Sequence, residues 1–114
     1  MLAEARSRIA RYTPAEAFAA GDDVLLVDVR TERERELGGV IPGSTHVPRS
    51  VLEWRTDPSS ESCDPELVGR RLVIVCAQGY SSSLAAATLV ELGVDAGDLD
   101  GGFEAWAASG LPVE

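Results

Sequence analysis

Two continuously apolar runs stand out in the pattern of hydrophobic and polar positions along the chain. Val24–Val27 and Leu72–Val75 contain only aliphatic residues, and polar or glycine-containing segments flank both runs. Short aliphatic runs without polar alternation are typical of strands that are buried on both faces, as in parallel sheets. The pattern therefore predicts two central strands of a mainly parallel sheet.

Helix signals surround these two runs. Thr13–Glu16 and Thr31–Glu34 each place glutamate three residues after threonine, which is the pattern of a capping box at a helix start. Gly21 and the pair Gly38–Gly39 end these two helices. Further elements are expected as helices from about Ser81 to Leu92 and from about Phe103 to Ser109, a short helix opening at Asp64–Pro65, and an extended segment at Thr45–Val47.

Strands alternating with helices predict an α/β fold. Asp28 and Cys76 each stand at the carboxyl end of a predicted strand. Ligands of open parallel sheets bind beyond the carboxyl ends of the strands, where loops meet helix N-termini. We therefore expect these two residues to share one rim of the sheet.

The segment after Cys76 has the properties of an anion-binding loop. A short loop that contains Gly79 leads directly into a helix, so several backbone N–H groups and the helix dipole can face one site. Such donors favour a thiolate over a thiol, and Ser81 and Ser82 add hydroxyl groups that can also cap the helix. These residues alone leave two interpretations open, since free cysteines are also common as small buried residues.

Composition narrows the class of protein. The chain has 114 residues with 45% hydrophobic content, which suits one domain, here expected at residues 13–114 after a lead-in at 1–12. The net charge of -9 disfavours nucleic acid as a partner, although all ten basic residues are arginine. No run is long enough for a membrane span, the N-terminus lacks a secretory signal, and only two cysteines occur, so a cytoplasmic location is expected.

Four motifs occur in one order along the chain: Val27-Asp28-Val29-Arg30, the turn Gly39–Ser44 followed by Val47-Pro48, the loop from Cys76, and Asp100–Trp106 leading to Gly110–Val113. Their order and spacing resemble the rhodanese family of single-domain sulfurtransferases, from about Thr13 to Val113. The resemblance implies a central, mostly parallel five-stranded sheet flanked by helices. It implies no metal or other cofactor.

The resemblance also implies a site. Cys76 would be the nucleophile that takes sulfane sulfur from a donor such as thiosulfate and passes it to cyanide or a cellular thiol, including a protein thiol. The loop amides would stabilise the anions. Asp28 and Arg30 would organise the rim, and Arg49 is a further candidate for positive charge there, with a solvated arginine as the alternative. The loop residues implied to bind substrate are Ala77, Gln78, Gly79, Tyr80, Ser81 and Ser82.

Loop length separates the relatives within this resemblance. The six residues Cys76–Ser81 match the sulfurtransferase loop, whereas related phosphatases and arsenate reductases have one residue more and end it with arginine, where this chain has Ser82. Ala77 and Ser81 stand where many family loops carry arginine, and Val40 stands where histidine is frequent. The alternative is therefore a non-catalytic rhodanese module that binds a partner or senses sulfide or oxidants.

The remaining notable side chains are expected in supporting or structural places. His46, the only histidine, is expected as a strand residue and not as a proton shuttle, and Trp106 as part of the core. Tyr80 should wall the pocket. Trp54 lies in a segment that could border the site or line a partner surface, with ordinary partial burial as the alternative. Cys63 could resolve a persulfide as a disulfide, with an incidental thiol as the alternative.

Overall fold

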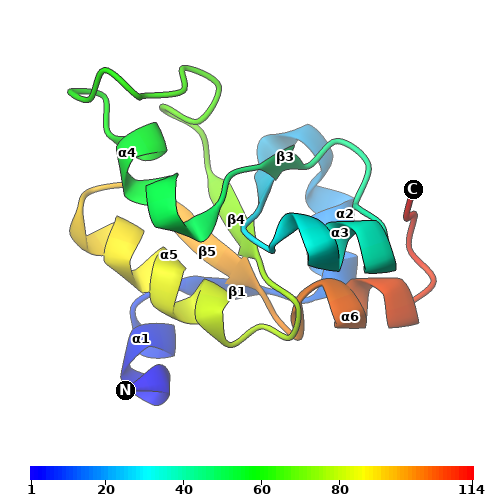
Figure 1. The fold of residues 1–114 in the computed structure, drawn as a ribbon. Coiled ribbons are helices and arrows are strands. Elements are labelled where there is room, and N and C mark those ends of the chain that lie inside the picture. Colours follow the sequence, from blue (N-terminus) through cyan, green and yellow to red (C-terminus); the bar gives the residue numbers. More distant parts are fainter.

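The computed structural model describes residues 1–114 and contains one five-stranded sheet between two layers of helices (Figure 1). The strand order is β1-β5-β4-β2-β3, and every neighbouring pair is parallel. The strands are β1 (Ala10–Tyr12), β2 (Leu25–Asp28), β3 (Thr45–His46), β4 (Leu72–Val75) and β5 (Ala96–Leu99). The predicted α/β class with a parallel five-stranded sheet is confirmed.

The helices are α1 (Leu2–Ser7), α2 (Pro14–Ala20), α3 (Glu32–Gly38), α4 (Leu52–Thr56), α5 (Ser81–Glu91) and α6 (Gly102–Ala108), with 3-10 turns η1 (Gly21–Asp23) and η2 (Arg49–Val51). None of them is long and apolar enough to cross a membrane. Both predicted capping boxes are present, because the Thr13 and Thr31 hydroxyls each accept from the glutamate N–H three residues on.

The burial of the central strand β4 explains why its sequence is entirely aliphatic. All four of its residues are buried, and they alternate between two apolar clusters on opposite faces of the sheet. Leu72 and Ile74 face the cluster formed with α4 and α5, whereas Val73 and Val75 face the cluster formed with α2 and α6. A strand covered on both faces has no position for a polar residue, which is why the run is continuously aliphatic.

The first twelve residues are part of this fold. β1 pairs with β5 along Ala10–Tyr12, and α1 lies against α5 (Figure 1). This placement differs from the lead-in expected at residues 1–12. A three-residue edge strand that starts Ala10-Arg11 is too short and too polar to show strand periodicity, so the pattern could not reveal it.

Two other local expectations differ from the structure. The segment after Asp64 forms successive turns instead of a helix, closed by the Leu67 N–H donating to the Asp64 carbonyl. The strand β5 was not expected, because Gly97 and Asp98 interrupt its apolar pattern, yet all four of its residues are buried. The predicted helices near 81–92 and 103–109 are confirmed as α5 and α6.

Candidate active site

Asp28 and Cys76 lie at the same edge of the sheet, as the pattern predicted. Asp28 ends β2 opposite Val75 of the neighbouring strand β4, and Cys76 follows Val75 directly. Cys76 lines a pocket of about 260 Å³. The pocket is lined by Val29, Arg30, Glu34, Cys76, Ala77, Gln78, Tyr80 and Ser81.

The loop after Cys76 curls around the sulfur. The backbone N–H groups of Gly79 and Ser82 donate to Cys76 Sγ, at 3.0 Å and 3.3 Å from nitrogen to sulfur. Ser82 lies in the first turn of α5, so the sulfur accepts one of the N–H groups that a helix start leaves without an internal partner. The sulfur therefore occupies the position of an anionic helix cap.

These donors change the acidity of the thiol. Burial of the sulfur raises the pKa of Cys76, but hydrogen bonds from the Ser82 and Ser81 side chains and from the Ser82 and Gly79 N–H groups lower it more, so the pKa lies below its ordinary value. The Ser82 hydroxyl has one proton and donates it to Asp98 at 2.9 Å. The Ser81 hydroxyl and the two backbone N–H groups are therefore the donors that the thiolate keeps.

The start of α6 supports the loop from one side. The Phe103 N–H donates to the Cys76 carbonyl at 2.8 Å, and the Glu104 N–H donates to the Ala77 carbonyl at 3.0 Å. Gly102 has a φ of +65°, and a Cβ built on it would lie 2.4 Å from the Cys76 carbonyl oxygen. Only glycine fits this approach, which gives the Gly101-Gly102 motif a physical reason.

Asp28 and Arg30 form a closed pair beside the pocket. Arg30 Nη2 lies 2.9 Å from Asp28 Oδ2 and donates to the Gly39 carbonyl at 2.7 Å, and its guanidinium carbon stacks 3.8 Å from the centre of the Phe103 ring. The side chains of Asp28 and Arg30 are only 3% and 2% exposed. Their contacts stabilise the rim, and Asp28 Oδ2 also lies 3.3 Å from Arg35 Nε, so this carboxylate pairs with two guanidinium groups.

Other predicted residues fall into different places. Tyr80 lines the pocket as expected, and Ser81 does so without capping α5, which has no side-chain cap. Arg49 does not line the pocket and pairs with Glu53. The Ser82 side chain is fully buried and its hydroxyl donates to Asp98, so it is the Ser82 N–H that faces the Cys76 sulfur.

The remaining candidates lie away from the sulfur. His46 Nε2 is hydrogen-bonded to the Arg30 carbonyl at 2.9 Å, and Trp106 belongs to the core as expected. Cys63 is a free, half-buried cysteine that does not line the Cys76 pocket. Trp54 is 62% exposed and lies in α4, also outside that pocket.

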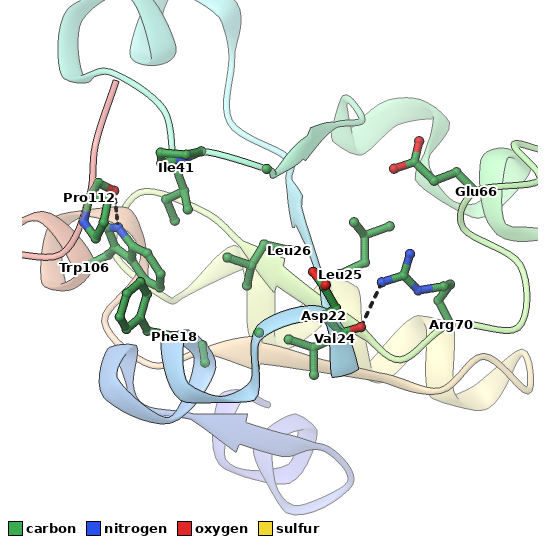
Figure 2. Close-up of a pocket in the computed structure, with 14 residues that line it drawn as sticks. Phe18, Asp22, Val24, Leu25, Leu26, Ile41, Glu66, Arg70, Trp106 and Pro112 are labelled. Carbon is green, nitrogen blue, oxygen red and sulfur yellow. Dashed lines mark hydrogen bonds between the residues drawn. The ribbon is translucent and has the colours of Figure 1, made fainter.

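A larger pocket of about 410 Å³ lies elsewhere on the domain (Figure 2). Phe18, Ile41 and Trp106 gather on one side of it, and Arg70 with Glu66 lies on the other. It contains no cysteine, and its strand residues come from the amino-terminal half of β2, whereas Cys76 lies at the carboxyl edge. Size alone does not identify the candidate site, and Cys76 with its backbone donors lies in the smaller pocket.

The fold and the cysteine loop define an α/β domain that presents one thiol to backbone donors at the carboxyl edge of a parallel sheet. The family model for the rhodanese-like domain matches residues 13–109, and the chain belongs to that family. A sulfurtransferase of Allochromatium vinosum is 34% identical to it over 100 residues, which cover 87% of this chain and 86% of the relative. Thiosulfate sulfurtransferase GlpE of Pseudoalteromonas translucida is 33% identical over 89 residues, 77% of each chain.

Solved structures give the same fold. A Rhodopseudomonas palustris protein described as of unknown function and a possible tyrosine phosphatase superposes with a TM-score of 0.93 at 39% identity, covering 99% of this chain and 90% of that one. A rhodanese-like domain protein from Staphylococcus aureus has a TM-score of 0.70 at 26% identity, covering 93% and 99%. The expected family resemblance is confirmed.

Proposed function

We propose that this chain is a sulfurtransferase that carries sulfane sulfur on Cys76. The observation that supports this most directly is the thiol sulfur held by the Gly79 and Ser82 N–H groups in a residue that lines an open pocket. Its lowered pKa favours the thiolate, which is the nucleophilic form. The names of the sulfurtransferase relatives support the same reaction class.

With thiosulfate as donor, the Cys76 thiolate attacks the outer sulfur. The sulfur–sulfur bond of thiosulfate breaks, sulfite leaves with the electron pair, and a Cys76 persulfide forms. An acceptor such as cyanide or a cellular thiol then attacks the terminal sulfur and restores the thiolate. The thiolate and the persulfide both carry negative charge at the end of the Cys76 side chain. The loop N–H groups and the α5 dipole stabilise this charge in both states.

The charge around the pocket affects which donor binds. Ala77 and Ser81 contribute no positive charge, the Arg30 guanidinium is occupied by Asp28 and the Gly39 carbonyl, and Glu34 lies at the pocket wall. A doubly charged donor must therefore rely on backbone N–H groups and hydroxyls. We expect weak binding of thiosulfate, and a saturation curve that is sensitive to ionic strength.

The test is thiosulfate-dependent formation of thiocyanate from cyanide, combined with mass spectrometry of the loaded protein. The wild type should gain one sulfur atom on Cys76 and turn over, Cys76→Ser should do neither, and Cys63→Ser should behave like the wild type. Equal turnover and loading in wild type and Cys76→Ser would refute the proposal.

Phosphatase chemistry is tested separately because one similar structure is described as a possible tyrosine phosphatase. The five positions between Cys76 and Ser82 contain no arginine, and the buried Ser82 in the first turn of α5 stands where a phosphate-binding arginine would be needed. We expect no hydrolysis of para-nitrophenyl phosphate above the Cys76→Ser background. Cys76-dependent hydrolysis would reverse this assignment.

A further inference from the structure

The Cys76 loop is held from behind by two arginines of the first twelve residues. Arg6 of α1 donates through Nη2 to the Gly79 carbonyl at 2.9 Å, and Arg11 of β1 reaches the same oxygen at 3.4 Å. The Ser83 hydroxyl oxygen lies 3.2 Å from it, but its single proton goes to the closer Asp98 carboxylate, at 2.7 Å. One carbonyl in the middle of the loop thus has two charged side-chain donors.

A buried carboxylate connects these groups. Asp98 of β5 is fully buried and accepts from Arg11 at 2.9 Å and 3.2 Å, from the Ser82 hydroxyl at 2.9 Å and from the Ser83 hydroxyl at 2.7 Å. Arg6 Nε donates to the Ser83 oxygen at 3.1 Å. The network therefore joins the N-terminal segment, β5 and the first turn of α5 to the loop.

The two arginines differ in charge balance. Arg11 pairs with Asp98 and also lies 3.2 Å from Asp100. Arg6 forms no ion pair, and its two hydrogen bonds go to neutral oxygens of Gly79 and Ser83. In a chain of net charge -9, an unbalanced guanidinium thus contacts the loop that holds the nucleophile.

The contact also fixes a peptide plane. In a trans peptide the N–H points opposite to the carbonyl, so a Gly79 carbonyl held toward Arg6 directs the Tyr80 N–H to the other side of the loop. Hydrogen bonds from a cation to the carbonyl polarise the peptide, which makes its N–H a stronger donor. Tyr80 lines the Cys76 pocket, and its N–H is the loop donor next to the two that already reach the sulfur.

We propose that Arg6 is a positioning residue of the Cys76 loop, which fixes the Gly79 carbonyl so that the Tyr80 N–H faces the anion exchanged at Cys76. It supplies from behind the positive charge that Ala77 and Ser81 do not supply within the loop. The identity of that anion as a sulfur donor rests on the proposed function. The effect on the thiol itself does not.

The test measures alkylation of Cys76 in a Cys63→Ser background, where one thiol reacts. Neutral iodoacetamide and anionic iodoacetate are compared across pH for Arg6→Gln, Arg6→Lys and the control Arg8→Gln. Arg8 ends the same helix and pairs with Glu4 and Glu91 on the surface, so Arg8→Gln removes the same charge without touching the loop. All variants keep the other charged or titratable groups near the loop, which are Arg11, Arg30, Glu34, Tyr80, Asp98, Asp100 and Glu104.

Arg6→Gln should slow iodoacetamide at neutral pH by roughly threefold to tenfold, the change that a pKa rise of about half to one unit produces. It should slow iodoacetate more than iodoacetamide, because the anionic probe also loses the guanidinium charge. Arg6→Lys should restore the charge preference but only part of the rate, since lysine cannot bridge two acceptors as a planar fork. Arg8→Gln should leave both rates unchanged.

Equal rates, pH midpoints and probe ratios in Arg6→Gln and Arg8→Gln would overturn the proposal. A uniform loss of rate that tracks unfolding and that lysine does not relieve would overturn it too. Alkylation needs no sulfur transfer, so the two proposals can fail separately. If the wild type shows no turnover but Arg6→Gln slows alkylation as expected, only the proposed function is refuted. If the wild type turns over but Arg6→Gln is alkylated like Arg8→Gln, only this inference is refuted.

Discussion

Two loops at the carboxyl edge of the sheet join a strand to a helix, but they are built in different ways. The loop between β2 and α3 is held by its own residues: Asp28 binds Arg30 two positions later, and Thr31 caps α3 with Glu34. The loop between β4 and α5 has no ion pair or capping box of its own, and its local side-chain bonds run from the Gly79 and Ser82 N–H groups to the Cys76 sulfur. It is held by Arg6 and Arg11, which precede it by more than sixty positions, and by the start of α6, which follows it.

The loop between β2 and α3 supports the stability of the fold, whereas the loop between β4 and α5 supports the reactivity of Cys76. The local loop buries a balanced ion pair and contributes a rigid wall to the pocket. The other loop leaves its N–H groups free for the sulfur, because its carbonyls are taken by remote partners on the opposite side. Local bonding suits a scaffold, whereas a loop that must present its own backbone to an anion needs support from elsewhere in the fold.

The largest effect is expected from breaking the local loop. Asp28→Asn leaves the nearly buried Arg30 guanidinium without a carboxylate, which should lower the free energy of unfolding by about 3–5 kcal/mol. Urea denaturation of this variant should be compared with Asp95→Asn, whose exposed pair with Arg71 should change stability by less than about 1 kcal/mol. Similar losses in the two variants would show that the rim pair is not the main support of this loop.

A smaller loss of stability, with a clear loss of reactivity, is expected at the remote support. Gly102→Ala places a Cβ against the Cys76 carbonyl at a positive φ and should cost about 2–5 kcal/mol, from strain and overpacking together. The matched control is Gly110→Ala, which has a φ of +77° and open space around it, and should cost about 1–2 kcal/mol.

Iodoacetamide alkylation of the folded variants then tests whether the contact between Gly102 and the Cys76 carbonyl affects the thiol. Cys76 should react more slowly in Gly102→Ala than in the wild type, because the displaced carbonyl shifts the sulfur relative to its N–H donors. Gly110→Ala should keep the wild-type rate. Equal rates in both variants would mean that the loop holds its shape without α6.

The smallest effect concerns pH. The lowered pKa of Cys76 means that the folded state favours the thiolate, so the thiolate stabilises the fold above the unfolded thiol pKa of about 8.5, and this contribution is lost as the pH falls through the folded pKa. In a Cys63→Ser background, the free energy of unfolding of the protein with Cys76 should be compared with that of Cys76→Ser. The difference between them should rise with pH and then level off. A difference that falls with rising pH would show that burial outweighs the N–H donors.

The sequence predicted much of the loop between β2 and α3 and part of the loop between β4 and α5. The capping boxes, the two apolar strands, α5, α6 and the position of Cys76 beside Asp28 follow from local patterns, because caps and periodicity act over a few residues. β1 and β5 were missed since one is short and the other contains Gly97 and Asp98. An expected strand at 96–99 would have marked Asp98 as a buried carboxylate that needs a partner.

What the sequence by itself determined is the central strands, several of the helices and the place of Cys76: apolar runs must be buried, glycine and threonine mark helix ends, and one cysteine stands where a central strand stops. Only the tertiary structure decided what surrounds that cysteine. Arg11 and Asp98 lie 87 positions apart, and Arg6 and Gly79 lie 73 apart. No local pattern links such residues, because their contact exists only once the sheet has brought β1 beside β5 and α1 against α5.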